Sequence, residues 1–564
     1  MVRHEGKDYF VNEPALAHVG DDGGFAMVLP SRWFLKGGKI WAKVQRLISH
    51  ASEGLLIDNR DDACLEIPVQ DFFLSYPDLK VTHTSYGLPD PSEIKGLARE
   101  KSQLLYNILF LATSNLASPL EMFDAIVKAL KDARENGIEA YDCELKEMVL
   151  LLPWILAMLG NNPMQSEFSS HIGLTGKCFC RVCHVRGADA KNRPEGTARE
   201  EERVRDFLST SSERNKDNTI HALQERLRDY LRGAPSAAPG KATESGVKDR
   251  FFQHFADQLA TACANVKERQ KEDPSIQGTE YIVSFLRNLR ESMPEDLKLF
   301  SLALQLEDFD PNRDSPVEIL HVVLLGFVKY FWRDAVSCQN REGKETLKAR
   351  INSFEPTELG TPKPRGVTLV QYAGSLTGRD FRLVLQLAPA VLYGLILSEA
   401  YEAWLALCRL APLVFQPEIV DCTAYLKRLQ AAVDDFLAAT ALWNMQLFNK
   451  PKFHILLHIL LHIKHFGPPI LTATEGFESY NFVIHLHSVH SNRQAPSIDI
   501  GNSFDLLHTI WHLVSGGWIV QDPSPSDAPL VQQAGHSVRK LVNNPVLLKL
   551  LGMTDFFSSS KYGM

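Results

Sequence analysis

The chain has 564 residues, enough for two to four domains that each bury a core, and its 45% apolar and 23% charged residues are ordinary for a globular protein. A net charge of −8 disfavours a protein that coats DNA over its whole surface, because neutralising phosphates requires a surplus of Lys and Arg. No apolar run reaches the roughly 18 to 20 residues that span a bilayer, and the N-terminus lacks the apolar core of a secretory signal. We therefore expect an intracellular protein, nuclear or cytoplasmic, with no membrane partner.

Residues 1–91 predict a small β-rich domain. Three segments in it carry alternating or β-branched apolar residues between Gly, Asp and Asn, a pattern typical of short strands: 25–29, 40–47 and 64–68. The stretch 86–91 contains two prolines and predicts the turn that ends this domain.

A helical pattern follows. Ser118 can cap a helix, and Glu121, three residues later, can complete a capping box. We expect this helix to run to about Asn136 and to stop at Gly137. The segment 147–159 is almost wholly apolar but too short for a membrane, so it predicts a buried strand or a core helix.

The middle of the chain divides by composition. Residues 187–247 are polar and rich in mixed charge, which predicts an exposed, partly disordered insertion with one or two solvated helices. Residues 248–449 predict a helical domain with long amphipathic helices at 249–270, 278–292, 316–337, 380–410 and 418–447. The expected fold class is mixed α/β, predominantly α.

One cysteine cluster could bind a metal. The nine cysteines are an odd number and otherwise scattered, which argues against a disulfide framework and for a reducing compartment. Cys180 and Cys183 form a Cys-x-x-Cys pair that could share a tetrahedral zinc ion. A closed site needs four ligands, and His171, Cys178 and His184 are the nearby candidates. Buried cysteines without a metal are the alternative.

A second group of candidate ligands lies late in the chain. His454, His458 and His462 recur every four residues and would line one face of a helix, where histidines four apart can bind zinc. The residues between them are apolar, so a core helix with a polar stripe is the alternative interpretation.

Five blocks in a fixed order resemble fungal CACTA/Plavaka-type (KDZ-related) transposases. The strongest is Gly-Asn-Asn-Pro-Met-Gln-Ser-Glu at 160–167, followed by His-Ile-Gly-Leu-Thr-Gly-Lys and the cysteine cluster at 171–183. The other blocks are 110–117, 316–321, 373–381, and 448–454 running through 474–481 to 489–493. The resemblance covers nearly the whole chain.

This resemblance implies a DDE transposase with an RNase H-like core, in which three acidic residues hold two Mg²⁺ ions for DNA strand transfer. The family's acidic residue in Gly-Asp-Asn-Pro falls on Asn161, an amide that lacks the charge Mg²⁺ prefers. The last acidic residue falls on Glu478, with Glu475 as the weaker candidate. The segment that carries the first one is missing before residue 110, which indicates an internal deletion. Asp61, Asp62 and Asp90 do not replace it.

The resemblance also places the domains. The core would be degenerate and split into 92–186 and 450–520, with residues 187–449 inserted between the halves and a tail and final helix at 521–564. The family's acidic-x-x-His element falls on Glu318 and His321, although a polar pair at the start of a helix is the simpler interpretation. His490, Asn492 and Arg493 could contact a phosphate backbone.

We therefore expect a transposable-element-derived protein that no longer cuts DNA and no longer binds Mg²⁺, with residual DNA binding or self-association. One alternative is an active Mg²⁺-dependent nuclease that uses Glu167, Glu318 and Glu478. Another is a zinc-stabilised protein-interaction module. No P-loop, hydrolase elbow or dinucleotide motif occurs in the sequence, so no small-molecule cofactor is expected.

Overall fold

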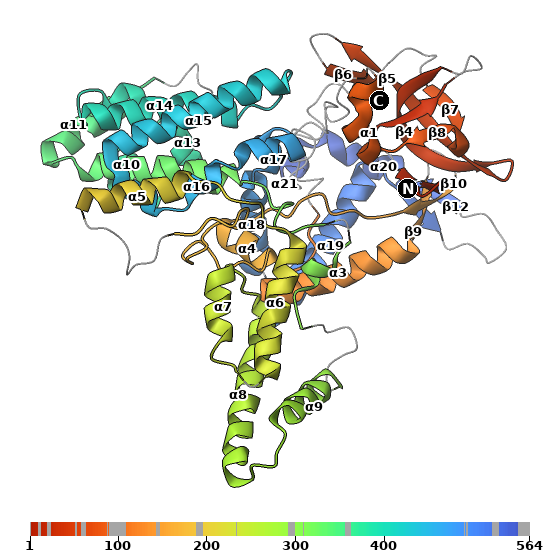
Figure 1. The fold of residues 1–564 in the computed structure, drawn as a ribbon. Helices are drawn as coiled ribbons and strands as arrows, with labels where there is room; N and C mark the ends of the chain where they lie inside the picture. The colour runs from red at the N-terminus through yellow and green to blue at the C-terminus, as the bar shows by residue number, and fades with distance from the viewer. Residues whose placement is uncertain are drawn as a thin grey trace. The chain divides into compact units, whose positions relative to one another are not determined.

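The computed structural model (Figure 1) describes residues 2–9, 13–19, 24–50, 54–57, 64–86, 88, 109–114, 116–142, 147–187, 196–232, 234–291, 299–307, 309–355, 363–489, 491, 494–521 and 530–550. Its contacts divide the chain into two units. Unit 1 comprises residues 1–101 and 417–428, and unit 2 comprises residues 102–416 and 429–564. No helix within the described ranges is both long and apolar enough to cross a membrane.

Unit 1 is built on an antiparallel sheet, which confirms the expected β-rich N-terminal domain. The strand order is β6-β5-β4-β3-β8, and β7 also pairs with β5. The long hairpin of β4 and β5 turns at Gly37 and Gly38, whose φ angles of 60° and 75° suit a two-residue turn that only small residues adopt easily. The strands are β1 (Val2–His4), β2 (Lys7–Tyr9), β3 (Ala15–His18), β4 (Phe25–Lys36), β5 (Lys39–His50), β6 (Gly54–Ile57), β7 (Cys64–Pro68) and β8 (Phe72–Leu74). Short helices η1 (Val69–Asp71), α1 (Tyr76–Thr82) and η2 (His83–Tyr86) follow.

Unit 2 begins with the capped helix that the sequence predicts. Helix α3 (Pro119–Asn136) has Ser118 as its N-cap, with both bonds of the capping box to Glu121, and ends at Gly137. A hairpin of β9 (Ile138–Asp142) and β10 (Glu147–Leu151) comes next. The expectation that 147–159 is buried is wrong for most of the segment, because Met148, Leu150, Leu151, Leu152, Trp154 and Leu156 are all exposed.

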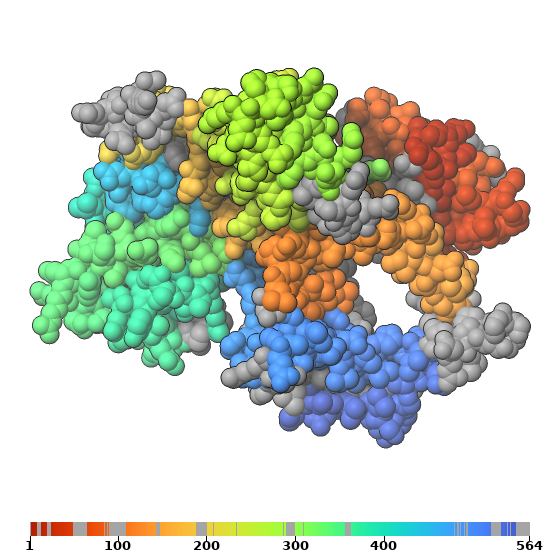
Figure 2. Space-filling view, turned by 90° about the horizontal axis from the view of Figure 1, so that it is seen from below, coloured from red at the N-terminus to blue at the C-terminus, as the bar shows by residue number. Residues whose placement is uncertain are grey.

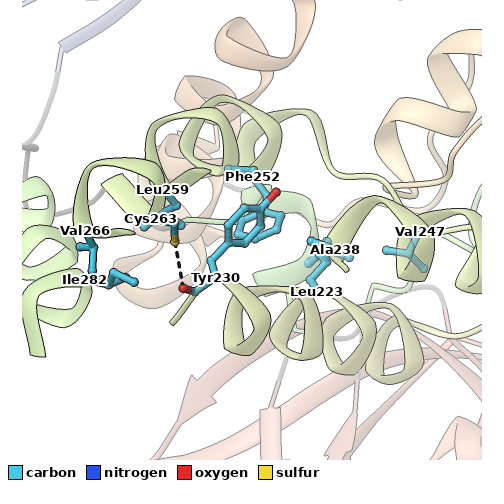
Figure 3. Close-up of a cluster of buried hydrophobic side chains, with 11 residues drawn as sticks. Leu223, Tyr230, Ala238, Val247, Phe252, Leu259, Cys263, Val266 and Ile282 are labelled. Carbon is cyan, nitrogen blue, oxygen red and sulfur yellow. Dashed lines mark hydrogen bonds between the residues drawn. The ribbon is translucent and has the colours of Figure 1, made fainter. Parts of the chain in front are cut away.

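Four helices then share one core (Figure 3). They are α6 (Lys216–Leu231), α7 (Ala238–Ser245), α8 (Arg250–Glu272) and α9 (Gly278–Glu291). Tyr230 on α6 packs against Phe252 on α8, and the Cys263 thiol donates a hydrogen bond to the Tyr230 carbonyl. Helices α6 and α7 thus contribute to the same core as α8, although their polarity predicts an exposed insertion at 187–247. The yellow-green side chains of α8 and α9 form one continuous body on the face drawn in Figure 2.

A second group of helices contains the largest buried aromatic side chains. It comprises η7 (Leu320–Val328, a π-helix), α10 (Lys329–Ser337), α11 (Arg341–Asn352), α12 (Gly366–Gln371), α13 (Gly378–Leu392), α14 (Ser398–Val414), α15 (Cys422–Asn444), η9 (Met445–Asn449), α16 (Lys452–Leu456) and α17 (Ile459–Phe466). The single helix expected at 380–410 is two helices, because the chain turns at Gly394 with φ of 70°.

The remaining elements belong to unit 2, whereas α15 begins with residues 422–428 of unit 1. They are α4 (Asn162–Phe168), α5 (Gly196–Leu208), η6 (Leu302–Gln305), η10 (Pro469–Thr472), α18 (Glu475–Val489), α19 (Pro496–Val514), β11 (Trp518–Gln521), β12 (Leu530–Gln533), α20 (His536–Arg539), η11 (Lys540–Asn543) and α21 (Pro545–Leu550). The chain is therefore mixed α/β and predominantly helical, as expected. Within the described part of unit 2, the strands form two separate hairpins, β9–β10 and β11–β12.

Candidate metal centre

A tight loop holds the two cysteines of the Cys-x-x-Cys pair. The backbone N–H groups of Val182 and Cys183 lie 3.3 and 3.4 Å from the Cys180 sulfur and donate to it. Nε of Arg214 donates to the carbonyls of Cys180 and Cys183 at 2.9 and 3.0 Å. Both cysteines are completely buried. Backbone N–H groups thus fix the Cys180 sulfur, and Arg214 holds the loop that carries both cysteines.

The histidines approach from the other end of unit 2. His454 lies on α16, and His458 lies at the junction between α16 and α17. Both rings are buried, and the ring of Phe179 meets His454 edge-on at 5.3 Å. The apolar residues between the histidines, such as Ile455 and Leu456, are buried as well. The segment thus forms two short core helices, and its histidines point into the protein.

Four donor atoms converge on one point. The sulfur of Cys180 lies 3.3 Å from Nε2 of His458, the sulfur of Cys183 lies 3.3 Å from Nε2 of His454, and the two Nε2 atoms are 3.1 Å apart. All four lie within 4.8 Å of one another, so this group could hold a metal ion. Tetrahedral zinc, with bonds of about 2.3 Å to sulfur and 2.0–2.1 Å to nitrogen, separates such ligands by roughly 3.3 to 3.8 Å.

Two of the four donors, Cys183 and His458, already favour the charge state that a metal requires. Hydrogen bonds from Cys180 and from the two histidines lower the pKa of Cys183 well below that of an ordinary thiol, whereas burial raises the pKa of Cys180. Burial also lowers the pKa of His458 and keeps its imidazole neutral. Metals bind thiolates and neutral imidazoles, and two thiolates would balance a divalent cation.

The other expected ligands lie outside this group. Nε2 of His171 is 2.8 Å from the carbonyl of Cys178, and its Nδ1 accepts from the N–H of Gly173. Burial and the charge of Arg214 lower the pKa of His171 to about 3. The Cys178 thiol donates to the carbonyl of Glu244 at 3.2 Å. His171 therefore helps to shape the loop, and the structure brings His454 and His458 to the two cysteines instead.

Sequence spacing does not pair these four residues. Each half contains two plausible ligands, but 271 residues separate Cys183 from His454 and 278 separate Cys180 from His458. A closed zinc site needs four ligands, and each half offers two. This count could have indicated that the two pairs bind the same ion. The third histidine of the stripe, His462, uses Nδ1 to accept a hydrogen bond from the N–H of Val317.

A buried arginine connects the cysteine loop to the next candidate site. Arg181 is completely buried and donates to Oδ1 of Asn162 at 3.1 Å and to the carbonyl of Pro316 at 3.3 Å. Asn161, where the family has an acidic residue, is the N-cap of α4, and its Oδ1 accepts from the N–H of Met164 at 3.0 Å. The amide oxygen of Asn161 is thus engaged in capping the helix.

Glu318, His321 and Glu478 form a second polar group. The buried carboxylate of Glu318 accepts four hydrogen bonds: one oxygen from the backbone N–H groups of Leu320 and Thr474, the other from the N–H and the ring Nδ1 of His321. The Nε2 of His321 lies 3.1 Å from Glu478, whose side chain is 43% exposed. Burial raises the pKa of Glu478, although His321 opposes this shift. The structure thus brings these three residues together.

The other candidate site residues lie apart from these two groups or outside the described residues. Glu167 forms an ion pair with Arg250 at 2.9 Å and does not belong to the group of Glu318, His321 and Glu478. The proposed DNA contacts His490, Asn492 and Arg493 lie outside the described residues. Asp61, Asp62 and Asp90 lie outside them too, as does the stretch before residue 109 where the first acidic segment would belong. Among the residues that are described, the cysteine–histidine group is the one set of three or more potential ligands close enough to share an ion.

Comparison with known proteins finds a match in the N-terminal region. A family model described as a domain of unknown function (DUF8591) matches residues 1–109. No curated protein and no solved structure matches the chain. The match ends before α3, so it covers the β-rich N-terminal region and leaves the candidate metal centre outside.

Proposed function

We propose that the chain is a zinc-stabilised protein derived from a DDE transposase of the CACTA/Plavaka kind, and that it no longer performs strand transfer. The observation that carries this proposal is the buried group of Cys180, Cys183, His454 and His458. Two thiolates and two imidazoles in tetrahedral spacing suit zinc better than metals that prefer oxygen ligands. Four protein ligands leave no open position, so the zinc is structural.

Transposase descent is supported by the way distant blocks of the resemblance meet. The block at 171–183 meets 448–454 in the metal centre. The block at 316–321 meets 474–481 through His321 and Glu478. Arg382, beside the block at 373–381, forms an ion pair with Glu475. Phe110 packs with Tyr480 and Phe504 in one buried cluster. A protein that diverged from this family would keep these contacts even after losing its activity.

Loss of strand transfer is supported by the side chains at the candidate acidic positions, which are uncharged or already engaged in hydrogen bonds. Asn161 carries no charge and caps a helix. Glu318 already accepts hydrogen bonds on both oxygens from four donors, so binding Mg²⁺ would require breaking several of them. Glu478 is the one partly exposed carboxylate of the set. In this proposal β9, β10 and α4 are remnants of an RNase H-like core.

The metal is tested by elemental analysis of the purified chain. The expected result is about one zinc per chain, lost in Cys183→Ser and in His458→Gln. Cys178→Ser is the matched control, because Cys178 is a buried thiol of the same loop that lies outside the four donors. If Cys183→Ser fails to fold, cobalt substitution of the unaltered chain decides: intense visible bands indicate tetrahedral thiolate ligation. A chain free of zinc whose cobalt spectrum is octahedral would refute the proposal.

The loss of activity is tested by incubating the chain with Mg²⁺ or Mn²⁺ and a labelled DNA duplex. We expect no cleavage above the background given by the Glu478→Ala variant. Metal-dependent cleavage that disappears in Glu478→Ala would show an active nuclease and overturn this part of the proposal, while leaving the zinc centre untouched.

A further inference from the structure

We infer that unit 2 carries a phosphate-binding site formed by four cationic side chains of α10 and the 449–452 segment, two of which lie over the ring of Tyr330. Lys329 and Arg333 lie one helical turn apart on α10, and Lys450 and Lys452 flank Pro451 between η9 and α16. This cation cluster (Lys329, Arg333, Lys450, Lys452) does not depend on transposase descent, because it rests on the positions of these side chains alone.

The two lysines of the 449–452 segment point at the same aromatic ring. The ammonium groups of Lys450 and Lys452 lie 5.2 and 5.4 Å from the centre of the Tyr330 ring. Their hydrogen-bond acceptors are neutral: Lys450 donates to the Asn449 side chain at 3.0 Å, and Lys452 donates to the Leu325 carbonyl at 3.2 Å. An aromatic ring and neutral oxygens orient the lysines without cancelling their charges.

No carboxylate of the described residues forms a direct ion pair with the cluster, although Glu318 attracts Lys452 from a longer distance. The nearby Glu200 on α5 accepts from Gln446 instead. Burial and the positive charge of Arg333 lower the pKa of Lys450, which shows that the cations repel one another. Like charges gathered in this way destabilise a chain unless an anion binds between them.

The platform beneath the cluster is rigid. Phe327 and Phe453 pack with ring centres 4.7 Å apart, and Phe448 packs on Phe453 at 4.9 Å, all of them fully buried. These rings join η7, directly before Lys329, to the segment that carries Lys450 and Lys452. The backbone segments that carry the cations are therefore fixed before a ligand arrives, which reduces the entropy cost of binding.

Clustered Lys and Arg side chains around an aromatic ring recognise phosphate groups. The phosphates could belong to a nucleic-acid backbone or to a free phosphate compound. The chain as a whole carries a net charge of −8, so a bound anion would have to be attracted by such a local cluster and not by the general charge of the protein.

The experiment compares the intact chain with Arg333→Gln/Lys450→Gln and with a matched control, Lys344→Gln/Lys348→Gln. The control removes the same charge from α11, where Lys348 pairs with Glu345. One probe is a fluorescent 20-base-pair duplex, titrated at several salt concentrations. The other is inorganic pyrophosphate, followed by calorimetry. Zinc content and thermal unfolding show that each variant is folded.

For the duplex, we expect at least tenfold weaker binding in Arg333→Gln/Lys450→Gln, and a slope of log K against log salt that is smaller by roughly 1 to 2, because each lost phosphate contact contributes about 0.9. The control should bind like the intact chain. Pyrophosphate binding that disappears in the cluster variant would support the same site and identify a free phosphate compound as the source. Equal binding of both probes by the cluster variant and the control, or no binding by the intact chain, would overturn the inference.

Discussion

Glu318 shows how one residue can be buried and charged without binding a metal. Each of its oxygens accepts two hydrogen bonds, and three of the four donors are backbone N–H groups. Such donors stabilise the ionised carboxylate because they are fixed in place when the chain folds. The bonds also link the start of η7 to Thr474, directly before α18. Glu318 therefore holds two distant segments together.

Replacing this carboxylate with an amide should be costly. In Glu318→Gln, the NH₂ group would face two donors, so two hydrogen bonds are lost and buried N–H groups are left unpaired. We expect the free energy of unfolding to fall by about 2 to 4 kcal/mol. Urea unfolding at neutral pH, followed by tryptophan fluorescence, measures this loss. Glu402→Gln, on the exposed surface of α14, is the control, and equal midpoints for the two variants would contradict the prediction.

The same carboxylate predicts a dependence of stability on pH. Burial alone would raise the pKa of Glu318, but the hydrogen bonds from His321 and Thr474 outweigh it and leave the pKa below 4.5. A depressed pKa in the folded state contributes stability above the unfolded pKa, and this contribution is lost as the pH falls through the folded value. As the pH falls below the ordinary pKa of 4.5, the free energy of unfolding should therefore decrease more in the intact chain than in Glu318→Gln. Parallel pH profiles for the two proteins would rule out this role.

At the scale of single elements, the sequence predicted the features that depend on residues close to one another in the chain, such as the ends of a helix. The start and end of α3 followed from Ser118, Glu121 and Gly137, because a cap and a stop act within one helical turn. The β-rich N-terminal domain followed from alternating residues and turn glycines. The π-helix η7 was not predicted. The break at Gly394 was not predicted either, although the glycine that makes it, with φ of 70°, is a local signal in the sequence.

Burial and the candidate metal centre were harder to predict than helix ends. The apolar strand β10 was expected inside the protein, but its composition alone does not say whether another layer covers it. The metal centre needs segments more than 270 residues apart, and no rule of sequence spacing reaches that far. Each half of the site was visible in the sequence, whereas their pairing is a property of the fold.

Two glycines test how far backbone conformation controls these elements. Gly137 has φ of 71° and ψ of 167°, a region that is almost exclusive to glycine, and an added Cβ would lie 2.3 Å from Leu150. We expect Gly137→Ala to lower the free energy of unfolding by about 1 to 3 kcal/mol.

Gly240 lies inside α7 with open space around it, so Gly240→Ala should raise the free energy of unfolding by about 0.5 to 1 kcal/mol. Thermal unfolding of both variants shows whether the stability falls in Gly137→Ala and rises in Gly240→Ala. A Gly137→Ala variant that is more stable than the intact chain would contradict the prediction.

At the scale of the whole molecule, the two units are stabilised by different interactions. Unit 1 depends on the packing between strands of one antiparallel sheet. Unit 2 contains all four donors of the candidate metal centre, and they connect an early loop to late helices. A metal that binds only the folded state stabilises the part of the chain that contains its ligands. The two units should therefore respond differently when the metal is removed.

This difference can be measured by scanning calorimetry of the full chain with and without a zinc chelator. Removing a structural zinc ion should cost several kcal/mol, enough to lower the midpoint of the transition that belongs to unit 2 by roughly 10 °C. The transition of unit 1 should keep its midpoint, because none of the four donors lies in residues 1–101 or 417–428. Cys178→Ser should behave like the intact chain, and Cys183→Ser should already unfold at the lower temperature and show no further response to the chelator. If both transitions shift together, the zinc supports the chain as one cooperative body; if neither shifts, the four donors hold the fold together without a metal.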